Sequence, residues 1–422
     1  MGFLGLGEPS LGTFIIFLGA WINRDFTTPV DRYAYTHHEP HLDDTERSSE
    51  NPVTKIEPLA WNRQDRWRQR EISAFGFRKV INTPNTAVFQ GRLLSRFLLR
   101  FPFLIEIVYW GLIYSVYQMG RAMLAERLRD STVDVACHHA LQVIRLEERL
   151  HIFWEPAIQR FFLQYPGVMY WVNRIYSYVH LPATVTFLVG LYWFAITRNR
   201  TLARWRQAAS GPYLYESKRR SLAICNLLAF CVFSTWPCMP PRLLGDSKTP
   251  GDAEHARSFG FVDTVHGRDG AVSVFNTRRF TNQLAAMPSL HFGYSLLIGL
   301  SIIQLPIAHP GRCYRVSIPV PFFSKFGFET VSASIRVPSL AKLACQIVGF
   351  SYPAMILTVI VATANHFIMD AVAGGTICLL AYRYNEAMLN FLPLEDCLLW
   401  CLRIHKPVQE PVCPSKNPDE YS

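Results

Sequence analysis

Long blocks of apolar residues alternate with polar segments along this chain. Six such blocks cover residues 102–119, 170–196, 222–239, 288–307, 343–363 and 366–382. Several of them approach the roughly 20 residues that a helix needs to cross about 30 Å of hydrocarbon. The pattern therefore predicts an all-α integral membrane protein with a core of six transmembrane helices.

A further segment, between the first two blocks, has apolar residues at helical spacing. Residues 136–163 show this pattern, with Glu147, Glu148, Arg149 and Glu155 among the apolar positions. An amphipathic helix on the membrane surface has such a pattern, and so has an ordinary helix with one solvated face. We expect an amphipathic surface helix, with the second interpretation open.

The pattern also divides the chain into three regions. Residues 1–100 are predicted to form an N-terminal extramembrane region, because 24–100 are polar and show no sustained periodicity. An apolar run at 11–22 could add a short membrane segment there. Residues 101–385 are predicted to be the transmembrane domain, and 386–422 a cytosolic tail.

Composition and charge support this interpretation. Half of the 422 residues are hydrophobic and the mean hydropathy is positive, which is rare in a soluble chain. The net charge is +10, but the basic residues cluster between the apolar blocks, which favours topology signals over nucleic-acid binding. The ten cysteines form no Cys-x-x-Cys or Cys/His zinc spacing, so no metal site is predicted.

The basic residues also predict orientation. The segment 198–220 is rich in Lys and Arg and is therefore expected in the cytosol. By alternation, residues 239–287 lie on the opposite face, and residues 308–341 and the tail return to the cytosol. We expect a multi-pass protein of the endomembrane system, with any site near 240–290 on the lumenal face.

Ionisable residues at the ends of the last blocks are the first candidates for chemistry, because they are costly in membrane helices. His366 opens the sixth block and Asp370 follows four residues later, so on a helix both side chains share one face. A carboxylate that orients one imidazole nitrogen leaves the other as a nucleophile or base. Attack of His366 on phosphorus would give a phosphohistidine.

A second group of candidates lies on the same predicted face. His291 opens the fourth block directly after Pro288 and Ser289, which are good helix-start residues and leave backbone N–H groups for an anion. Arg242 follows the third block, and its guanidinium could clamp phosphate oxygens. Alone, each of these residues is weak evidence; their convergence on one face favours a phosphate site.

These motifs resemble a known family. Pro-Ser-Leu-His at 288–291 and His-Phe-Ile-Met-Asp at 366–370 are similar to the second and third signatures of the type 2 phosphatidic acid phosphatase (PAP2) superfamily. The likeness covers roughly residues 140–385. Ala-Ala-Met before 288, Pro-Pro-Arg-Leu-Leu at 240–244 and Gly-Phe-Val-Asp-Thr at 260–264 most resemble the branch related to fungal inositol phosphorylceramide synthase.

The resemblance implies roles for the candidates. It implies a six-helix membrane core in which His366 forms the phospho-intermediate, Asp370 activates it and His291 protonates the leaving oxygen. Related chains tend to carry acids at Glu147 and Glu155, which would cap the site or order the surface helix, although ordinary surface acids explain them nearly as well. No cofactor is implied.

Two departures from the family pattern affect the expected phosphate site. The first family signature, a Lys six residues before Arg-Pro, is replaced by Pro-Pro-Arg at 240–242, and the Ser-Arg before the third is Val-Ile at 359–360. Losing an arginine removes a charge-assisted clamp on the phosphate. The departures argue for the lipid phosphotransferase branch, or against phosphatase activity.

The sequence leaves the substrate and the acceptor open. The substrate is expected to be a lipid phosphate or diphosphate, and the acceptor is either water, as in a phosphatase, or a lipid or inositol hydroxyl, as in a phosphotransferase. The alternatives are an isoprenoid-diphosphate phosphatase or cyclase, and a catalytically inactive membrane scaffold or transporter that kept the fold.

Overall fold

A computed structural model shows how the chain folds. It describes residues 7–25, 66–74, 76–126, 130–198, 211–245, 253–265, 284–307, 314–319, 332–337 and 339–407. The chain splits into two compact units, one of Met1–Ile16, Gly111–Asn385 and Pro411–Ser422 and the other of Phe17–Trp110 and Glu386–Glu410. The predicted division of the chain into three functional regions stays a prediction.

All six predicted blocks are helical. They correspond, in order, to α4 (Leu104–Glu126), to the continuous run α7 (Pro166–Arg174), η2 (Ile175–Val179), α8 (His180–Tyr192) and η3 (Trp193–Thr197), and to α10 (Pro212–Thr235), α13 (Leu290–Ile303), α14 (Leu340–Ala362) and α15 (Ile368–Arg383). The short turns η2 and η3 are π-helical. The prediction of a mostly helical chain is confirmed.

Fewer helices than six are long and apolar enough to cross a membrane unaided. Within the described residues two qualify, Pro166–Thr197 and Leu340–Ala362, and a third does if α3 (Leu93–Arg100) and α4, bent by 98°, are one span. At 1.5 Å per residue the 14 residues of α13 cover only about 21 Å. The chain therefore has candidate membrane spans, while the six-helix core stays a prediction.

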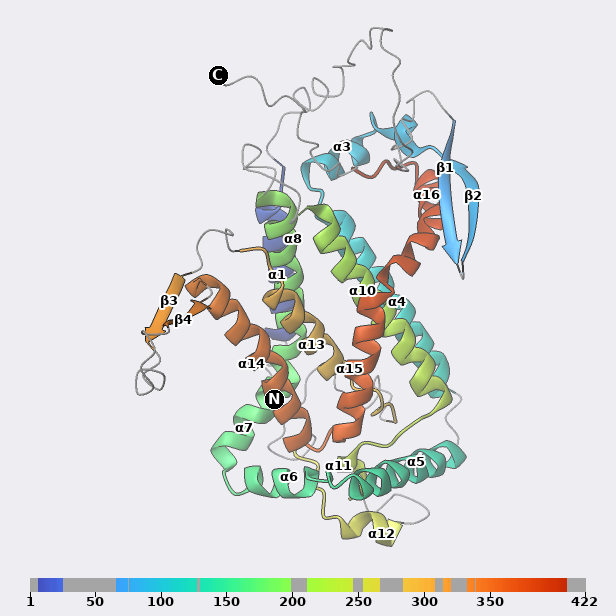
Figure 1. The fold of residues 1–422 in the computed structure, drawn as a ribbon. Helices are drawn as coiled ribbons and strands as arrows, with labels where there is room; N and C mark the ends of the chain where they lie inside the picture. The colour runs from blue at the N-terminus through green and yellow to red at the C-terminus, as the bar shows by residue number, and fades with distance from the viewer. Residues whose placement is uncertain are drawn as a thin grey trace. The chain divides into compact units, whose positions relative to one another are not determined.

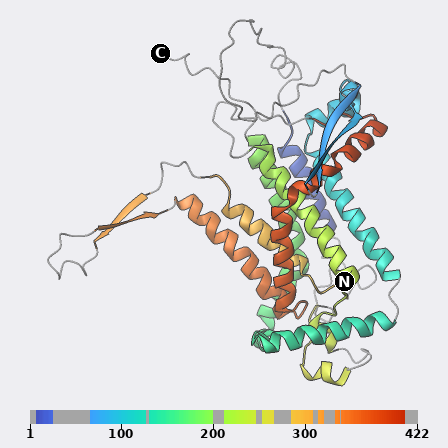
Figure 2. The same cartoon turned by 45° about the vertical axis from the view of Figure 1, so that its right-hand side comes forward.

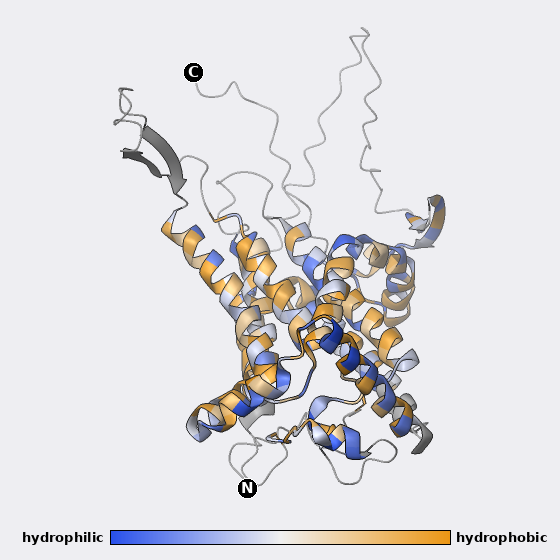
Figure 3. Ribbon diagram, turned by 60° about the horizontal axis from the view of Figure 1, so that its bottom comes forward, coloured by the Kyte–Doolittle hydropathy of each residue, from blue (hydrophilic) through white to orange (hydrophobic). Residues whose placement is uncertain are grey.

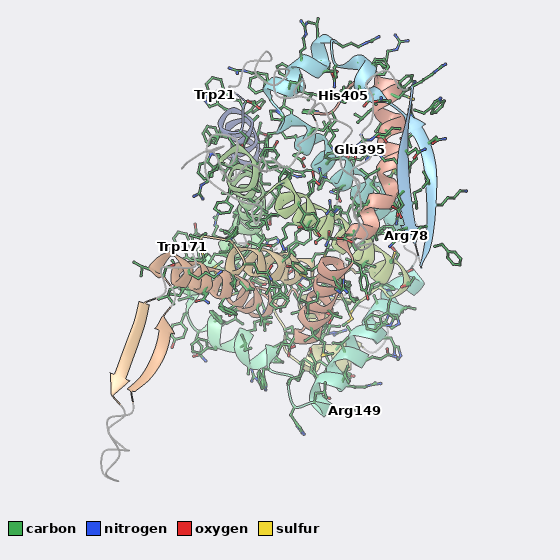
Figure 4. All side chains as sticks on the ribbon, turned by 45° about the horizontal axis from the view of Figure 1, so that its top comes forward. Trp21, Arg78, Arg149, Trp171, Glu395 and His405 are labelled. Carbon is green, nitrogen blue, oxygen red and sulfur yellow. The ribbon has the colours of Figure 1, made fainter. Side chains whose placement is uncertain are left out.

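The exposed surface of the two longest spans suits contact with lipid. Exposed apolar side chains include Trp171 (Figure 4) and Leu181 on the first span and Ile347 and Phe350 on the second. Figure 3 shows that hydrophobic residues predominate along the long helices. Exposed apolar surface of this kind is expected where hydrocarbon is the solvent.

Three details of the sequence interpretation need correction. The basic loop predicted to extend to residue 220 ends earlier, because α10 begins at Pro212, a favourable first helical residue, and Lys218 and Arg220 are buried within it. The amphipathic segment 136–163 is two helices, α5 (Asp130–Arg149) and α6 (Glu155–Leu163), separated where His151 has φ of 56°. The chain is also not purely helical, because it contains two β-hairpins.

The first hairpin belongs to the second unit. Strand β1 (Trp67–Ala74) pairs antiparallel with β2 (Phe77–Pro84), and η1 (Thr86–Phe89) and α3 follow. The remaining elements of this unit include α16 (Leu392–Leu402), whose Asp396 accepts two hydrogen bonds from Arg70 at 2.7 and 2.9 Å and one from Thr83 at 2.8 Å. His405 (Figure 4) hydrogen-bonds to Thr86 at 3.0 Å. Part of the predicted tail is thus folded against the hairpin.

The first unit holds all the candidate residues. Its other elements are α11 (Pro241–Leu244), α12 (Ala253–Ser258) and an antiparallel hairpin of β3 (Tyr314–Pro319) and β4 (Ser332–Val337), with η6 (Asn385–Phe391) at its boundary. Helix α13 packs against α10, α14 and α15. Figures 1 and 2 show α5 lying crosswise beneath the start of α15.

Two close helix contacts depend on glycine. A Cβ on Gly374 would meet the carbonyl oxygen of Ser289 at 2.2 Å, and one on Gly299 would meet the carbonyl oxygen of Gly349 at 2.2 Å. Small residues let helix backbones approach this closely in membranes. Gly374 therefore brings the start of α13, which carries His291, against α15, which follows His366.

Candidate active site

His366 lies in the turn between α14 and α15, with its side chain buried. Its Nδ1 is 2.8 Å from the carbonyl oxygen of Ala286 and 3.5 Å from Oδ2 of Asp370. A carbonyl oxygen can only accept, so the network assigns a hydrogen to Nδ1. In the neutral imidazole the Nε2 atom then keeps its lone pair and is the nucleophilic nitrogen.

Asp370 is fully buried in the first turn of α15. Its Oδ2 accepts a 2.9 Å hydrogen bond from the backbone N–H of Phe367, and its Oδ1 has no hydrogen-bond partner among the described residues. The carboxylate therefore caps the helix and lies within ion-pair range of His366. Ala286, rather than Asp370, is the closest partner of the imidazole, which the sequence pattern did not indicate.

His291 is the second residue of α13 and faces His366. Its Nδ1 lies 3.4 Å from His366 Nε2, and the two ring centroids are 5.5 Å apart. On its other sides it meets the rings of Tyr176 at 4.9 Å and His180 at 5.0 Å. The structure thus brings together the two histidines that the motifs single out.

His180 and Tyr176 were not among the predicted site residues. His180 begins α8, directly after the π-helical turn that contains Tyr176, and its Nδ1 is 3.4 Å from the hydroxyl of Tyr352. A π-helical turn inside a long helix is frequently found at functional sites. A signal did exist, because His180 is an ionisable residue within an apolar block.

Ser289 is the N-cap of α13 and is fully buried. Its Oγ accepts a 3.4 Å hydrogen bond from the backbone N–H of Phe292, and its own N–H donates to the carbonyl oxygen of Asp370 at 2.9 Å. The start of α13 is thereby fixed to the first turn of α15. The positive end of the α13 dipole lies at His291, next to the nucleophilic nitrogen of His366.

Arg242 is buried in α11 and contacts the residue next to His366. Its Nε donates to Oδ1 of Asn365 at 2.8 Å, one terminal nitrogen donates to Asp263 at 2.9 Å, and its backbone N–H donates to the carbonyl oxygen of Ala364 at 2.8 Å. Ala364 has φ of 51°, which is unfavourable outside glycine and needs support. Arg242 therefore brings its charge to the His366 turn and braces that turn.

Glu147 and Glu155 lie beneath the same turn and are fully buried. Oε1 of Glu155 accepts a 2.8 Å hydrogen bond from the backbone N–H of Ile368, and Oε1 of Glu147 accepts one of 2.7 Å from that of Met369. Ordinary surface acids would be exposed, so that interpretation is wrong. The carboxyls belong to the support of α15.

The residues at the departures from the family pattern are apolar and buried. Val359 and Ile360 lie in the hydrophobic clusters that join α14 to α6, α7 and η2. No group of three or more His, Cys, Asp or Glu side chains within the described residues is arranged to hold a metal ion. The polar groups next to the His366 imidazole among the described residues include the Ala286 carbonyl, Asp370 and His291.

Comparison with known protein families gives one match. A sequence profile of the PAP2 superfamily matches residues 141–211 and 205–320. The matched part contains Glu147, Arg242 and His291 and ends before His366 and Asp370. The match shows that this part of the chain is similar to the PAP2 superfamily.

Beyond this family match, no curated protein matches the chain. No solved structure matches it either. The superfamily match and the candidate membrane spans together indicate a membrane protein.

Proposed function

We propose that this chain is a membrane enzyme that transfers or hydrolyses the phosphoryl group of a lipid phosphate through a phosphohistidine on His366. One observation carries the proposal: His366 Nδ1 is engaged by Ala286, while Nε2 faces His291 Nδ1 across 3.4 Å. A nucleophile with its far nitrogen fixed and a second proton-carrying group beside it is the arrangement that covalent phosphoryl transfer needs.

In the first step, the lone pair of His366 Nε2 attacks phosphorus and the bond from phosphorus to the leaving oxygen breaks. Protonated His291 gives its proton to that oxygen, so the leaving group departs as an alcohol rather than an alkoxide. Phosphorylation makes the His366 ring cationic. The nearby Asp370 carboxylate, 3.5 Å from Nδ1, and the Ala286 carbonyl stabilise this cation.

In the second step, the oxygen of the acceptor attacks phosphorus and the bond between phosphorus and Nε2 breaks. Neutral His291 takes the proton of the attacking hydroxyl, which restores both histidines to their starting protonation states. A water acceptor releases inorganic phosphate. A lipid or inositol hydroxyl yields a new phosphate ester.

In-line attack sets a condition on His291. The leaving oxygen lies on the side of phosphorus opposite the nucleophile, so a group that protonates it lies farther from Nε2 than the 3.4 Å of His291 Nδ1. The two rings therefore separate when a phosphoryl group enters between them. The start of α13 and Arg242, which braces the same turn, are the groups proposed to hold the phosphate oxygens.

The finer assignment rests on sequence motifs. Pro-Pro-Arg-Leu-Leu at 240–244 and the apolar pair at 359–360 favour a lipid phosphotransferase that resembles the fungal inositol phosphorylceramide synthase branch, with sphingolipid-type substrates. The arginines of the sequence at 198–206 favour a lumenal site in an endomembrane. Both assignments are part of the proposal.

A second candidate, action on an isoprenoid diphosphate, is favoured by the aromatic rings around His291. Tyr176 and His180 lie at 4.9 and 5.0 Å from its ring, and Tyr294 lies 6.3 Å from His180. Aromatic faces stabilise the cation that forms when an allylic diphosphate departs. The same two histidines would then assist loss of diphosphate.

The test is turnover by detergent-purified protein on a panel of phosphatidate, ceramide with phosphatidylinositol, and farnesyl diphosphate. Phosphate release and headgroup exchange are measured for the wild type, His366→Ala and His291→Ala. The matched control is His138→Ala, which alters an exposed histidine of α5. The proposal expects the wild type to turn over one lipid phosphate. Both site variants should lose this turnover, and the control variant should keep it.

Other outcomes contradict the proposal in distinct ways. Turnover confined to farnesyl diphosphate would establish the second candidate. Wild-type turnover that survives His366→Ala would exclude the phosphohistidine. A folded wild type with no turnover on any substrate of the panel would favour the non-enzymatic scaffold or transporter.

A further inference from the structure

Two carboxyls occupy the amide groups at the start of α15. A helix leaves its first N–H groups without intrahelical partners, and in α15 those of Ile368 and Met369 donate to Glu155 at 2.8 Å and to Glu147 at 2.7 Å. Both acids come from helices more than 200 positions earlier, α5 and α6. These two amides therefore support the start of α15 and are not available to bind a phosphate ligand.

The two carboxyls also interact with each other. Glu147 and Glu155 lie close enough for their carboxyls to interact, and a proton held between them would turn two groups that otherwise only accept into a donor and an acceptor. The Oε2 atoms of both side chains are buried and have no hydrogen-bond partner among the described residues. Burial, and then the charge of Glu155, raises the pKa of Glu147 to about 9, and burial raises the pKa of Glu155.

We propose that Glu147 and Glu155 are positioning residues for the proposed reaction, which share one proton and thereby hold the His366 to Asp370 segment in place. The inference rests on the proposed function, because it gives His366 the role of the nucleophile. Neither acid contacts the reacting atoms. Each acts through a backbone amide two or three residues beyond His366.

The carboxyls can position the segment because α5 is itself fixed. Its buried face, with Ala140, Leu141 and Ile144 in one apolar cluster with Phe367, packs against the turn that contains His366. Figures 1 and 2 show α5 crossing beneath the start of α15, and Figure 4 labels Arg149 at its end. Glu147 thus transmits the position of a packed helix to the first turn of α15.

The shared proton limits the charge at this place. The titratable groups that face Glu147 are Glu155 of α6, Asp370 of α15 and the thiol of Cys238 in the segment after α10. With the proton in place, the three carboxyls carry two negative charges. Without it they carry three in a buried site, where like charges repel strongly. Loss of the proton is therefore expected to loosen the first turn of α15 and to lower turnover in alkali.

Substitution by glutamine tests this directly. In the Glu147→Gln variant, the new side-chain amide keeps an oxygen for the Met369 N–H and presents an N–H to Glu155, so it imitates the protonated acid at every pH. Glu147→Leu removes both interactions at similar volume. The matched control is Glu148→Gln, because Glu148 is the exposed neighbour on the same helix.

The measurement is kcat and KM against pH, from 6 to 10.5, on the lipid substrate of the wild type. We expect the wild-type kcat to fall as pH rises, with a midpoint near pH 9. The kcat of Glu147→Gln should be within about threefold of the wild-type value at pH 7 and should not fall at higher pH. Glu148→Gln should match the wild type throughout. Glu147→Leu is expected to lower kcat by about 10²-fold, because misplacing a reacting group by about 1 Å has an effect of this size, and to change KM little. Identical pH profiles for wild type and Glu147→Gln would overturn the proposal.

Hydrogen exchange of the backbone amides separates this inference from the proposed function. The protection of Ile368 and Met369, corrected for the intrinsic effect of pH, is expected to fall above pH 9 in the wild type and to persist in Glu147→Gln. Protection that follows this course in a protein without turnover would support the positioning role while the proposed function fails. If turnover depends on His366 but the protection of the Ile368 and Met369 amides does not depend on Glu147, the proposed function stands and the positioning role is rejected.

Discussion

His366 Nε2 lies 3.4 Å from His291 Nδ1, although 75 positions separate the two residues. The contact joins the turn before α15 to the first turn of α13. Gly374 allows it, because a side chain there would push α15 away from Ser289. In the proposed reaction, His366 is the imidazole that attacks and His291 is the one that carries a proton to the leaving group.

The first prediction separates the roles of the two histidines. His291→Ala is expected to lower turnover of a lipid alkyl phosphate by about 10²–10⁴-fold, the usual contribution of a general acid or base. With an aryl phosphate, whose leaving group needs no proton, the same variant should still phosphorylate His366 and then stall. The check is a rapid-quench experiment with substrate labelled in its phosphoryl group, in which an acid-labile label on the protein is measured.

The comparison variant for this prediction is His366→Ala, which should carry no label with either substrate. A label that appears equally in both variants would assign the intermediate to another residue.

A second prediction concerns Arg242 and its partner Asp263. Arg242→Lys keeps the charge but cannot bind Asn365 and Asp263 through two nitrogens at once, so it leaves one charge-assisted hydrogen bond unmade. The loss is expected to cost about 1.5–3 kcal/mol of unfolding free energy. Denaturant unfolding in detergent measures it.

Asp263→Asn is the matched test of the ion pair. It preserves an acceptor for Arg242 and leaves the Asn365 contact intact, so its stability should lie between those of the wild type and Arg242→Lys. Equal stability of all three proteins would show that the pair contributes nothing.

A third prediction follows from the raised pKa of Glu147. Burial is the main cause of its rise from 4.5 to about 9, so between these pH values the folded chain keeps a proton that the unfolded chain releases. This group therefore makes stability fall as pH rises from about 4.5 to 9, with no further change above. Glu147→Gln should flatten the dependence of the thermal unfolding midpoint on pH.

Glu148→Gln provides the reference slope for that experiment, because Glu148 is exposed. If the slopes of Glu147→Gln, Glu148→Gln and the wild type coincide, then Glu147 ionises alike in the folded and unfolded chains and the prediction is wrong.

A fourth prediction tests the helix contact that brings the histidines together. Gly374→Ala places a Cβ 2.2 Å from the Ser289 carbonyl oxygen, whereas Gly375→Ala places one 3.3 Å from a ring atom of Phe292. Alanine otherwise favours a helix by roughly 0.8–1.0 kcal/mol over glycine. We expect Gly374→Ala to lose about 1–3 kcal/mol of stability through overpacking, with reduced turnover, and Gly375→Ala to change little.

Circular dichroism during thermal unfolding and the lipid phosphate assay check both variants. Gly374→Ala with full stability and turnover would mean that α13 and α15 can separate without affecting the histidines.

Much of the fold and several site residues could be predicted from the sequence. Apolar blocks near the length of a membrane helix predicted where helices would lie, and the Pro-Ser start predicted the α13 terminus at Ser289. The spacing of His366 and Asp370 predicted that they would be neighbours, and they lie within 3.5 Å. These features depend on local sequence, which periodicity and capping rules describe.

The rest depends on contacts between distant segments. No spacing rule connects Ala286 to His366 or Glu147 to Met369, because these pairs meet only after α5 and α13 have packed. The start of α10 at Pro212 was missed because Lys218 and Arg220 look like loop residues, yet Lys218 lies over the ring of Tyr382 and near Gln304. Burial of a charge by such partners is a tertiary effect.

The contacts around the His366 turn also bear on biosynthesis. The acceptors at Glu147 and Glu155 are made over 200 residues before the amides of Met369 and Ile368 that donate to them. Glu147, Glu155 and His291 are therefore all synthesised before His366, the proposed nucleophile. Because such a long loop closes late, the proposed site is complete only once α15 has been made, and a product that ends before α15 is expected to lack Asp370.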